Sequence, residues 1–184
     1  MRQAIVLHLA ALPALLSGMA CSGPVHPQVH ADFIAGIRHG ATVTVMPAVV
    51  RRGAGQSHDE HAARRIAASL QRAGVNARAG GARVTVGEWH VNEARMARES
   101  AAALATYVGE RPTGTRYALA SEYLITSKGQ VGGVHAYVVR DDGAVAAILI
   151  QNSHHPLFQA ARPATPEDCT ELVIAAIEKN WITP

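Results

Sequence analysis

Three apolar segments joined by very short turns constrain the fold of this chain most. They span 115–125, 132–140 and 143–152. Turn residues separate them at 127–129, Ser-Lys-Gly, and at 141–143, Asp-Asp-Gly. Asp-Gly between two apolar runs is a strong hairpin signal. We therefore expect three consecutive antiparallel strands, forming a sheet that the rest of the chain covers.

The segments before the hairpins alternate between strand and helix patterns. A β-branched apolar run at 41–50 predicts a buried strand, in which Pro47 interrupts the pairing, and 82–89 predicts a second short strand. Strands linked through helices pair in parallel. With a helix after each of these strands and one at the end, the order is β-α-β-α-β-β-β-α. This order predicts an α/β (α+β) class: a single mixed sheet of about five strands with three helices.

Local signals mark where the three helices begin. Ser57 and Glu60 match a capping box before the first helix, which then stops at Gly74. Asn92 is a typical N-cap for the second helix. The third begins at 165–167, where threonine, a helix-first proline and glutamate follow one another. We expect that helix to run to about residue 180.

The first twenty residues have the pattern of an export signal. Arg2 gives a positive start, residues 4–16 are almost entirely apolar, and small residues lead to Cys21. This order of zones is typical of a secretory signal, and the apolar run is too short to span a bilayer. We divide the chain into a signal peptide (1–20), a lipid-attachment cysteine with a tether (21–40) and one α/β domain (41–184).

Two outcomes at Cys21 remain open. Residues 18–21 resemble a lipobox, which predicts lipidation of Cys21, and Ser22 in place of aspartate favours the outer membrane by resemblance to sorted lipoproteins. Ordinary cleavage after Ala20 is the alternative. A Cys21–Cys169 bridge would then be possible in an oxidising compartment. Neighbouring carboxylates argue against a catalytic thiol at Cys169.

Composition argues against nucleic-acid binding. Aromatic residues make up 4% of the chain, the formal net charge is +3, and the arginines are dispersed. Single-stranded nucleic acids need basic grooves with interleaved aromatic rings. We therefore expect no nucleic acid among the partners.

Histidines supply the alternative of a metal site. His58 and His61 are three residues apart on a predicted helix, and His154 and His155 are adjacent in a loop. Zinc needs three or four converging ligands, and the sequence has no HExxH spacing. The main prediction is no metal and no cofactor. The alternative combines His58 and His61 with His154 or His155.

No residue is predicted to be catalytic. No serine lies in a Gly-x-Ser-x-Gly elbow. Strand alternation places Glu122 on one face with Ala118 and Ala120. A carboxylate on an apolar face needs a partner or a raised pKa, whereas an exposed face near a sheet edge would need neither. We favour the exposed interpretation for Glu122.

Four features between residues 41 and 180 form a pattern: the strand VTVMPAVV at 43–50, a helix ending at 66–70, the Tyr-x-Leu-x-x-Glu-Tyr strand at 117–123 and the hairpin at 136–143. This pattern resembles a group of bacterial envelope lipoproteins. The group includes the curli-secretion lipoprotein and the lipoprotein activators of penicillin-binding proteins. This resemblance implies an assembly or adaptor role without catalysis, with an envelope protein or a second copy as partner.

Together these observations predict an exported, lipid-anchored, non-enzymatic protein of the cell envelope. Cys21 would attach it to the outer membrane, with the domain facing the periplasm. The alternative is a soluble periplasmic metal-binding protein or metal-dependent enzyme that uses the histidines.

Overall fold

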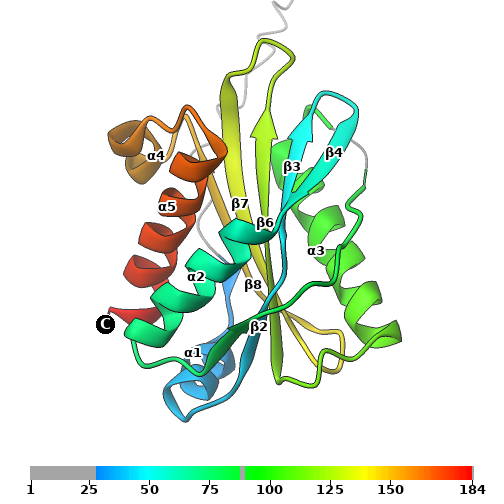
Figure 1. Cartoon of the computed structure of the whole chain (residues 1–184), viewed down its shortest axis with the longest axis vertical. Helices are drawn as coiled ribbons and strands as arrows, with labels where there is room; N and C mark the ends of the chain where they lie inside the picture. Colours follow the sequence, from blue (N-terminus) through cyan, green and yellow to red (C-terminus); the bar gives the residue numbers. More distant parts are fainter. Residues whose placement is uncertain (1–27, 88–89, 184) are drawn as a thin grey trace, which may run out of the picture.

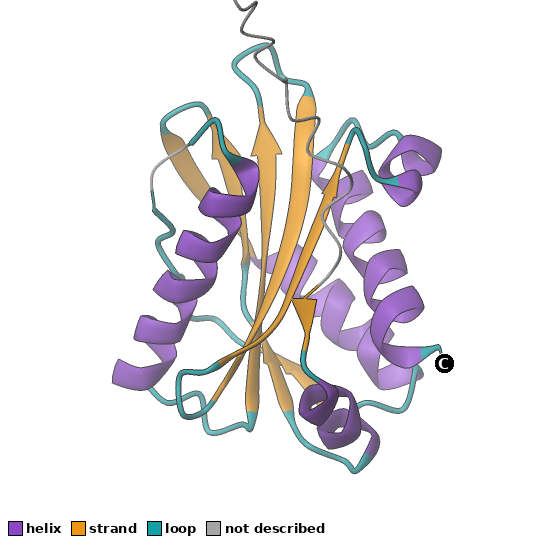
Figure 2. Ribbon diagram, turned by 180° about the vertical axis from the view of Figure 1, so that it is seen from behind, coloured by secondary structure: helices purple, strands orange, loops and turns teal. Residues whose placement is uncertain are grey.

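A computed structural model describes residues 28–87 and 90–183. These residues form one mixed β-sheet with helices on both faces (Figures 1 and 2). The strands are β1 (Gln28–Val29), β2 (Val43–Val45), β3 (Ala48–Arg52), β4 (Gly55–Asp59), β5 (Ala77–Ala79), β6 (Tyr117–Ile125), β7 (Val131–Arg140) and β8 (Val145–Asn152). The helices are α1 (Ala31–Arg38), α2 (Glu60–Arg72), α3 (Glu93–Glu110), α4 (Pro156–Ala161) and α5 (Pro166–Ile177), which a π-helical turn (Glu178–Ile182) extends.

The sheet combines both pairing directions, as the sequence predicted. Its order is β1-β8-β7-β6-β2-β5, and β3 also lies beside β6 and pairs with β4. β2 and β3 are parallel to β6, and β2 is parallel to β5. The hairpins β6–β7 and β7–β8 are antiparallel. The α/β class with one mixed sheet is therefore confirmed. The predicted element order with about five strands and three helices is wrong, because the described residues form eight strands and five α-helices.

Pro47 divides the predicted strand at 41–50 into β2 and β3. Both halves pair with β6, at residues 117–119 and 122–125 respectively. Proline has no N–H for the ladder, so the break falls where the sequence predicted it. The second half then turns at Gly53, which has a φ of +56°, and returns as β4.

The structure corrects three local predictions. Residues 82–87 form no strand, and β5 lies earlier, at 77–79. Ser57 is part of β4, so Asp59 caps α2 instead, accepting from two backbone N–H groups. Helix α1 occupies part of the predicted tether and buries Phe33, so the folded part begins well before residue 41.

Two apolar layers hold the sheet between its helices. One layer packs α1, α2 and α5 against one face, and the other packs α3 against the opposite face. α3 contacts β7 and β8 most, in the region where the polar residues described below lie. Among the described helices, none is long and apolar enough to cross a membrane.

Candidate functional site

The candidate site is a cleft of about 780 Å³ at the carboxyl ends of β3 and β6. Parallel strands of α/β sheets commonly bind ligands outside these ends. Three pieces of chain form its walls: the β3–β4 turn, the start of the β6–β7 turn, and the segment before α3. The described lining residues are Arg51, Gly53, Ala54, Gln56, Val86, Gly87, Ile125, Thr126 and Ser127.

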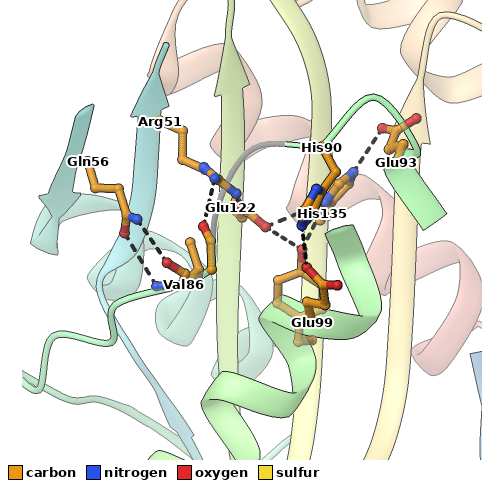
Figure 3. Close-up of polar contacts among 10 residues, drawn as sticks. Arg51, Gln56, Val86, His90, Glu93, Glu99, Glu122 and His135 are labelled. Atoms are coloured by element: carbon orange, nitrogen blue, oxygen red, sulfur yellow. Dashed lines mark hydrogen bonds and ion pairs between the residues drawn. The ribbon is translucent and has the colours of Figure 1, made fainter. Parts of the chain in front are cut away.

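Arg51 connects the cleft to a buried polar cluster (Figure 3). Its Nη1 donates to Glu122 Oε1 at 2.7 Å, and its Nη2 donates to the carbonyl oxygen of Gly87 at 2.7 Å. The side chains of Arg51 and Glu122 are only 3% and 0% exposed. The guanidinium therefore holds a cleft wall and neutralises a buried carboxylate at the same time.

Glu122 is fully buried, so the prediction that it lies on an exposed face is wrong. The predicted alternation is right, because Ala118 and Ala120 lie in the layer covered by α3. That helix closes the face over Glu122, which the strand pattern alone did not indicate. Because Glu122 is buried, its carboxylate needs hydrogen-bond or charge partners.

Tyr137 and His135 on β7 complete the partners of Glu122. The Tyr137 hydroxyl donates to Glu122 Oε2, and His135 Nδ1 lies 2.8 Å from the same hydroxyl oxygen. His135 Nε2 lies 2.8 Å from Glu93 Oε1 on α3. Because the Tyr137 proton goes to Glu122, Nδ1 has to donate to Tyr137, and Nε2 donates to Glu93. Only the imidazolium form of His135 donates from both nitrogens.

Glu93 closes the cluster at the first turn of α3. Asn152 Nδ2 donates to its second carboxylate oxygen. Gly133 leaves the space for this carboxylate, since a Cβ at that position would lie 2.6 Å from Glu93 Oε1. Two cations, Arg51 and His135, are thus balanced by two carboxylates, one buried and one partly exposed.

The pKa shifts follow from this balance. Burial raises the pKa of Glu122, but His135, Tyr137 and Arg51 together lower it to about 2. Burial lowers the pKa of His135, but Glu122 and Glu93 outweigh this effect and raise it above the ordinary value. Burial and the charge of Glu122 raise the pKa of Tyr137 well above 10. These shifts favour an ionised Glu122, a protonated His135 and a neutral Tyr137, which are the forms that their hydrogen bonds require.

Residues 82–87 form an extended strap, defined here by those residues, that side chains of β3 and β4 hold in place. The Gln56 amide donates to the Val86 carbonyl and accepts from the Val86 N–H, at 2.9 and 3.3 Å. His58 Nε2 lies 2.9 Å from the Val84 carbonyl oxygen. Valines 84 and 86 are buried, whereas Thr85 is exposed. Side-chain hydrogen bonds thus replace the backbone ladder that the predicted strand would have formed.

A separate ion pair stabilises the approach to α3. His90 Nε2 lies 2.7 Å from Glu99 Oε2, and Arg95 donates to the other oxygen of Glu99. The pKa of Glu99 is lowered by Arg95 and His90. All three side chains are partly or fully exposed, so this pair lies outside the buried cluster.

The predicted histidines lie apart in the fold. His58 is in β4, His61 is exposed in the first turn of α2, and His154 and His155 precede α4. The side chain of His155 accepts from the Leu157 N–H as the cap of α4. Within residues 28–87 and 90–183, no three His, Cys, Asp or Glu side chains are placed to hold a metal ion.

Of the two cysteines, the structure describes only Cys169. Cys21, the predicted lipidation site, falls outside the described residues, and so does the predicted bridge from Cys21 to Cys169. Cys169 is fully buried in α5. Burial and the charge of Asp168 raise the pKa of its thiol to about 12, in the direction that the sequence predicted.

Sequence reasoning missed Arg51, Tyr137 and His135. A partial signal existed for His135, which pairs with Glu122 across the β6–β7 hairpin. Glu122 lies five positions before the turn at 127–129 and His135 six positions after it, so folding the predicted hairpin symmetrically about that turn pairs Glu122 with Val134. A register shift between Leu124 and Ile125 places His135 opposite Glu122 instead, and the turn alone does not predict this shift. No comparable signal connects Arg51 to Glu122, because their strands are joined through two helices.

Comparison with protein-family models, curated proteins and solved structures finds no match to this chain. The functional argument therefore depends on the cleft, the buried cluster and the sequence pattern.

Proposed function

We propose that this protein is an exported, lipid-anchored binding module of the bacterial cell envelope. Its folded domain faces the periplasm from the outer membrane and works without catalysis. The observation that carries the binding role is the cleft at the carboxyl ends of β3 and β6. Its volume lies within the range of roughly 300–1,000 Å³ that is typical of ligand sites.

The lining chemistry favours binding over catalysis. Among the described lining residues, Arg51 is the only ionisable one, and Glu122 and Gly87 engage it. A general acid or base has to reach the reacting group, directly or through one water. His135 is fully buried behind the cleft and bound on both nitrogens. The cluster therefore serves to hold the wall of a binding surface.

The proposed export and lipid anchoring are inferred from the sequence. An apolar segment at 4–16 followed by small residues and Cys21 is typical of an exported lipoprotein. Intact mass of the mature protein extracted from membranes tests it. We expect a first residue at Cys21 and the added mass of acyl chains. An unmodified mature protein would contradict the anchor.

Crosslinking in living cells tests the binding role. A photo-reactive residue at Ser127 samples the cleft, and the same residue at Arg64, exposed on α2, is the matched control. We expect a discrete adduct at Ser127 that is absent at Arg64. The adduct should disappear when Ala54→Trp fills the cleft. Equal labelling at both sites, or an adduct that survives Ala54→Trp, would count against the cleft as the contact surface.

A further inference from the structure

We propose that a second cleft, beside α4, binds a small organic oxyanion: a carboxylate or phosphate group on a compact apolar body. This proposal concerns a different site from the cleft at β3 and β6 and does not rest on the proposed binding role. Three observations carry it, namely an arginine in the lining, the absence of acidic residues from the chain that forms the walls, and the backbone conformation of that arginine.

The second cleft has a volume of about 750 Å³, within the range of roughly 300–1,000 Å³ that is typical of ligand sites. It lies where α4 and the β6–β7 turn meet the same end of the sheet (Figures 1 and 2). We call it the α4 cleft and define it by lining residues of the turn and β7, of the end of β8, and of α4 with its cap: Gln130, Val131, Ser153, Phe158, Gln159 and Arg162.

Arg162 gives the α4 cleft a positive charge. It is the only ionisable residue of the lining that the structure describes, and its guanidinium has no ion pair or hydrogen bond with another described residue. A guanidinium presents a fork of N–H donors that matches the oxygens of a carboxylate or a phosphate. The lining therefore offers an oxyanion a charged partner that the fold itself does not use.

The chain around the α4 cleft contains no charge that would cancel Arg162. Its walls come from residues 123–140 and 143–166, and neither stretch contains aspartate or glutamate. The next acidic residues along the chain are engaged elsewhere: Glu167 pairs with Arg65, and Asp168 accepts from the backbone N–H groups of residues 164 and 165. Charge of one sign in a cleft attracts ligands of the opposite sign.

The backbone of Arg162 indicates that its side chain is not there to form the cap of α4. The residue has φ of +46° and ψ of +57°, and it is the only non-glycine residue with positive φ in the described ranges. Glycine is the usual residue at such a helix end. The capping bond runs from the Arg162 backbone N–H to the Phe158 carbonyl, and glycine would form it equally well. A requirement for the guanidinium in the cleft explains an arginine at this position.

The rest of the lining favours a ligand with an apolar part. Val131, Phe158 and Pro163 supply apolar contacts. The Gln159 amide donates to the Ser153 carbonyl, which fixes one polar side chain of the wall. An oxyanion at Arg162 with a compact apolar group would exchange water for apolar surface along this lining, whereas a bare inorganic ion would not.

Titration of the full chain carrying Cys21→Ala with benzoate tests the proposal, because this variant lacks the proposed acylation site and needs no detergent. Amide shifts of Gly129, Ser153 and Phe158 in ¹H–¹⁵N spectra report on the α4 cleft. We expect saturable shifts with benzoate or with phenyl phosphate, and the tighter of the two identifies the head group. Neutral benzamide and acetate, which lack the charge and the apolar body respectively, should each bind at least about tenfold more weakly, a difference of roughly 1.4 kcal/mol. Absence of saturation with both anions, or equal binding of either control compound, would overturn the proposal.

Substitutions test the role of Arg162. Arg162→Gln should weaken benzoate at least about tenfold, whereas Arg64→Gln, which removes an exposed arginine of α2, should leave its binding unchanged. Arg162→Gly should weaken benzoate as much as Arg162→Gln while resisting urea at least as well as the unchanged protein, because glycine adopts this backbone conformation freely. Equal weakening by Arg64→Gln would contradict a specific site. Loss of stability together with binding in Arg162→Gly would assign the side chain to the fold and overturn the proposal.

Ala54→Trp distinguishes this proposal from the proposed function. The substitution fills the other cleft, so it should abolish the Ser127 crosslink and leave the benzoate shifts unchanged. Disappearance of the shifts in Ala54→Trp would place the anion in the other cleft and contradict the α4 site. If benzoate fails to bind while the Ser127 crosslink forms, the α4 site is wrong and the binding role stands.

Discussion

Arg51 Nη1 and Glu122 Oε1 lie 2.7 Å apart, although 71 positions separate the two residues in sequence. The pair joins β3 to β6 inside the layer covered by α3. Through the second nitrogen of Arg51 it also reaches the Gly87 carbonyl, and thus one wall of the cleft. Stability of the domain and shape of the cleft therefore depend on the same contact.

Replacing Glu122 by glutamine should strongly destabilise the domain. The amide keeps the shape of the side chain but leaves Arg51 and His135 buried without their shared carboxylate. Removing one partner of a buried pair typically costs about 3–5 kcal/mol. Urea unfolding followed by circular dichroism measures this loss.

An exposed pair provides the control for this substitution. Asp142 accepts from Arg140 at the surface, where water and salt screen the charges. Asp142→Asn should therefore leave the unfolding midpoint close to that of the unchanged protein. Similar losses for Asp142→Asn and Glu122→Gln would contradict the importance assigned to the buried cluster.

The cluster should give the free energy of unfolding a defined pH dependence. The pKa of His135 is raised in the folded state, so its contribution is complete below the unfolded value of about 6.5 and decreases as pH rises toward the folded pKa. Glu122 acts in the opposite direction, because its pKa falls from 4.5 to about 2. Its contribution is complete above about 4.5 and is lost as pH falls toward 2. The joint contribution should therefore be greatest between about pH 4.5 and 6.5.

Comparison with His135→Gln isolates the alkaline part of this dependence. The unchanged protein should lose stability above pH 6.5 with a slope of up to about 1.4 kcal/mol per pH unit. The variant should be less stable at pH 6 and should lack that slope. Parallel curves for the two proteins above pH 6.5 would show that His135 does not titrate as inferred.

Local signals were sufficient for the elements that depend on short-range chemistry. The turns at 127–129 and 141–143 close the predicted hairpins, and Pro47 breaks the predicted strand. Asn92 caps α3, and Thr165 forms a capping box with Asp168. In each case residues within four positions of one another determine the geometry.

Two predictions that depended on distant contacts failed, namely the strand at 82–89 and the exposure of Glu122. Residues 82–87 have a strand-like pattern, but β4 meets them with the side chains of Gln56 and His58 rather than with its backbone. Glu122 is buried because α3 covers its face, and its cation comes from β3. Neither the helix docking nor the parallel β3–β6 register can be obtained from sequence periodicity.

Replacing Gln56 by alanine should release the strap locally. The substitution removes both hydrogen bonds to Val86, and a typical one contributes about 1 kcal/mol net. Hydrogen exchange of the Val86 amide should become faster, with a modest loss of global stability. Gln71→Ala is a suitable control, because Gln71 bonds the Ala77 carbonyl instead. Unchanged exchange at Val86 in Gln56→Ala would mean that burial of its side chain alone holds the strap.

Gly132 and Gly133 are adjacent on β7, but only Gly133 faces Glu93 closely. Substituting each in turn therefore distinguishes a steric effect on Glu93 from a general effect of changing the strand. A Cβ at Gly133 would lie 2.6 Å from Glu93 Oε1, whereas the nearest atom to a Cβ at Gly132 is 3.7 Å away. Gly133→Ala should therefore displace Glu93 from His135. Because Glu93 helps to raise the pKa of His135, that pKa should fall in Gly133→Ala and stay unchanged in Gly132→Ala. Titration of the imidazole by NMR measures both values. A fall of equal size in the two variants would attribute the effect to the strand backbone, and no fall in either would remove Glu93 from the cluster.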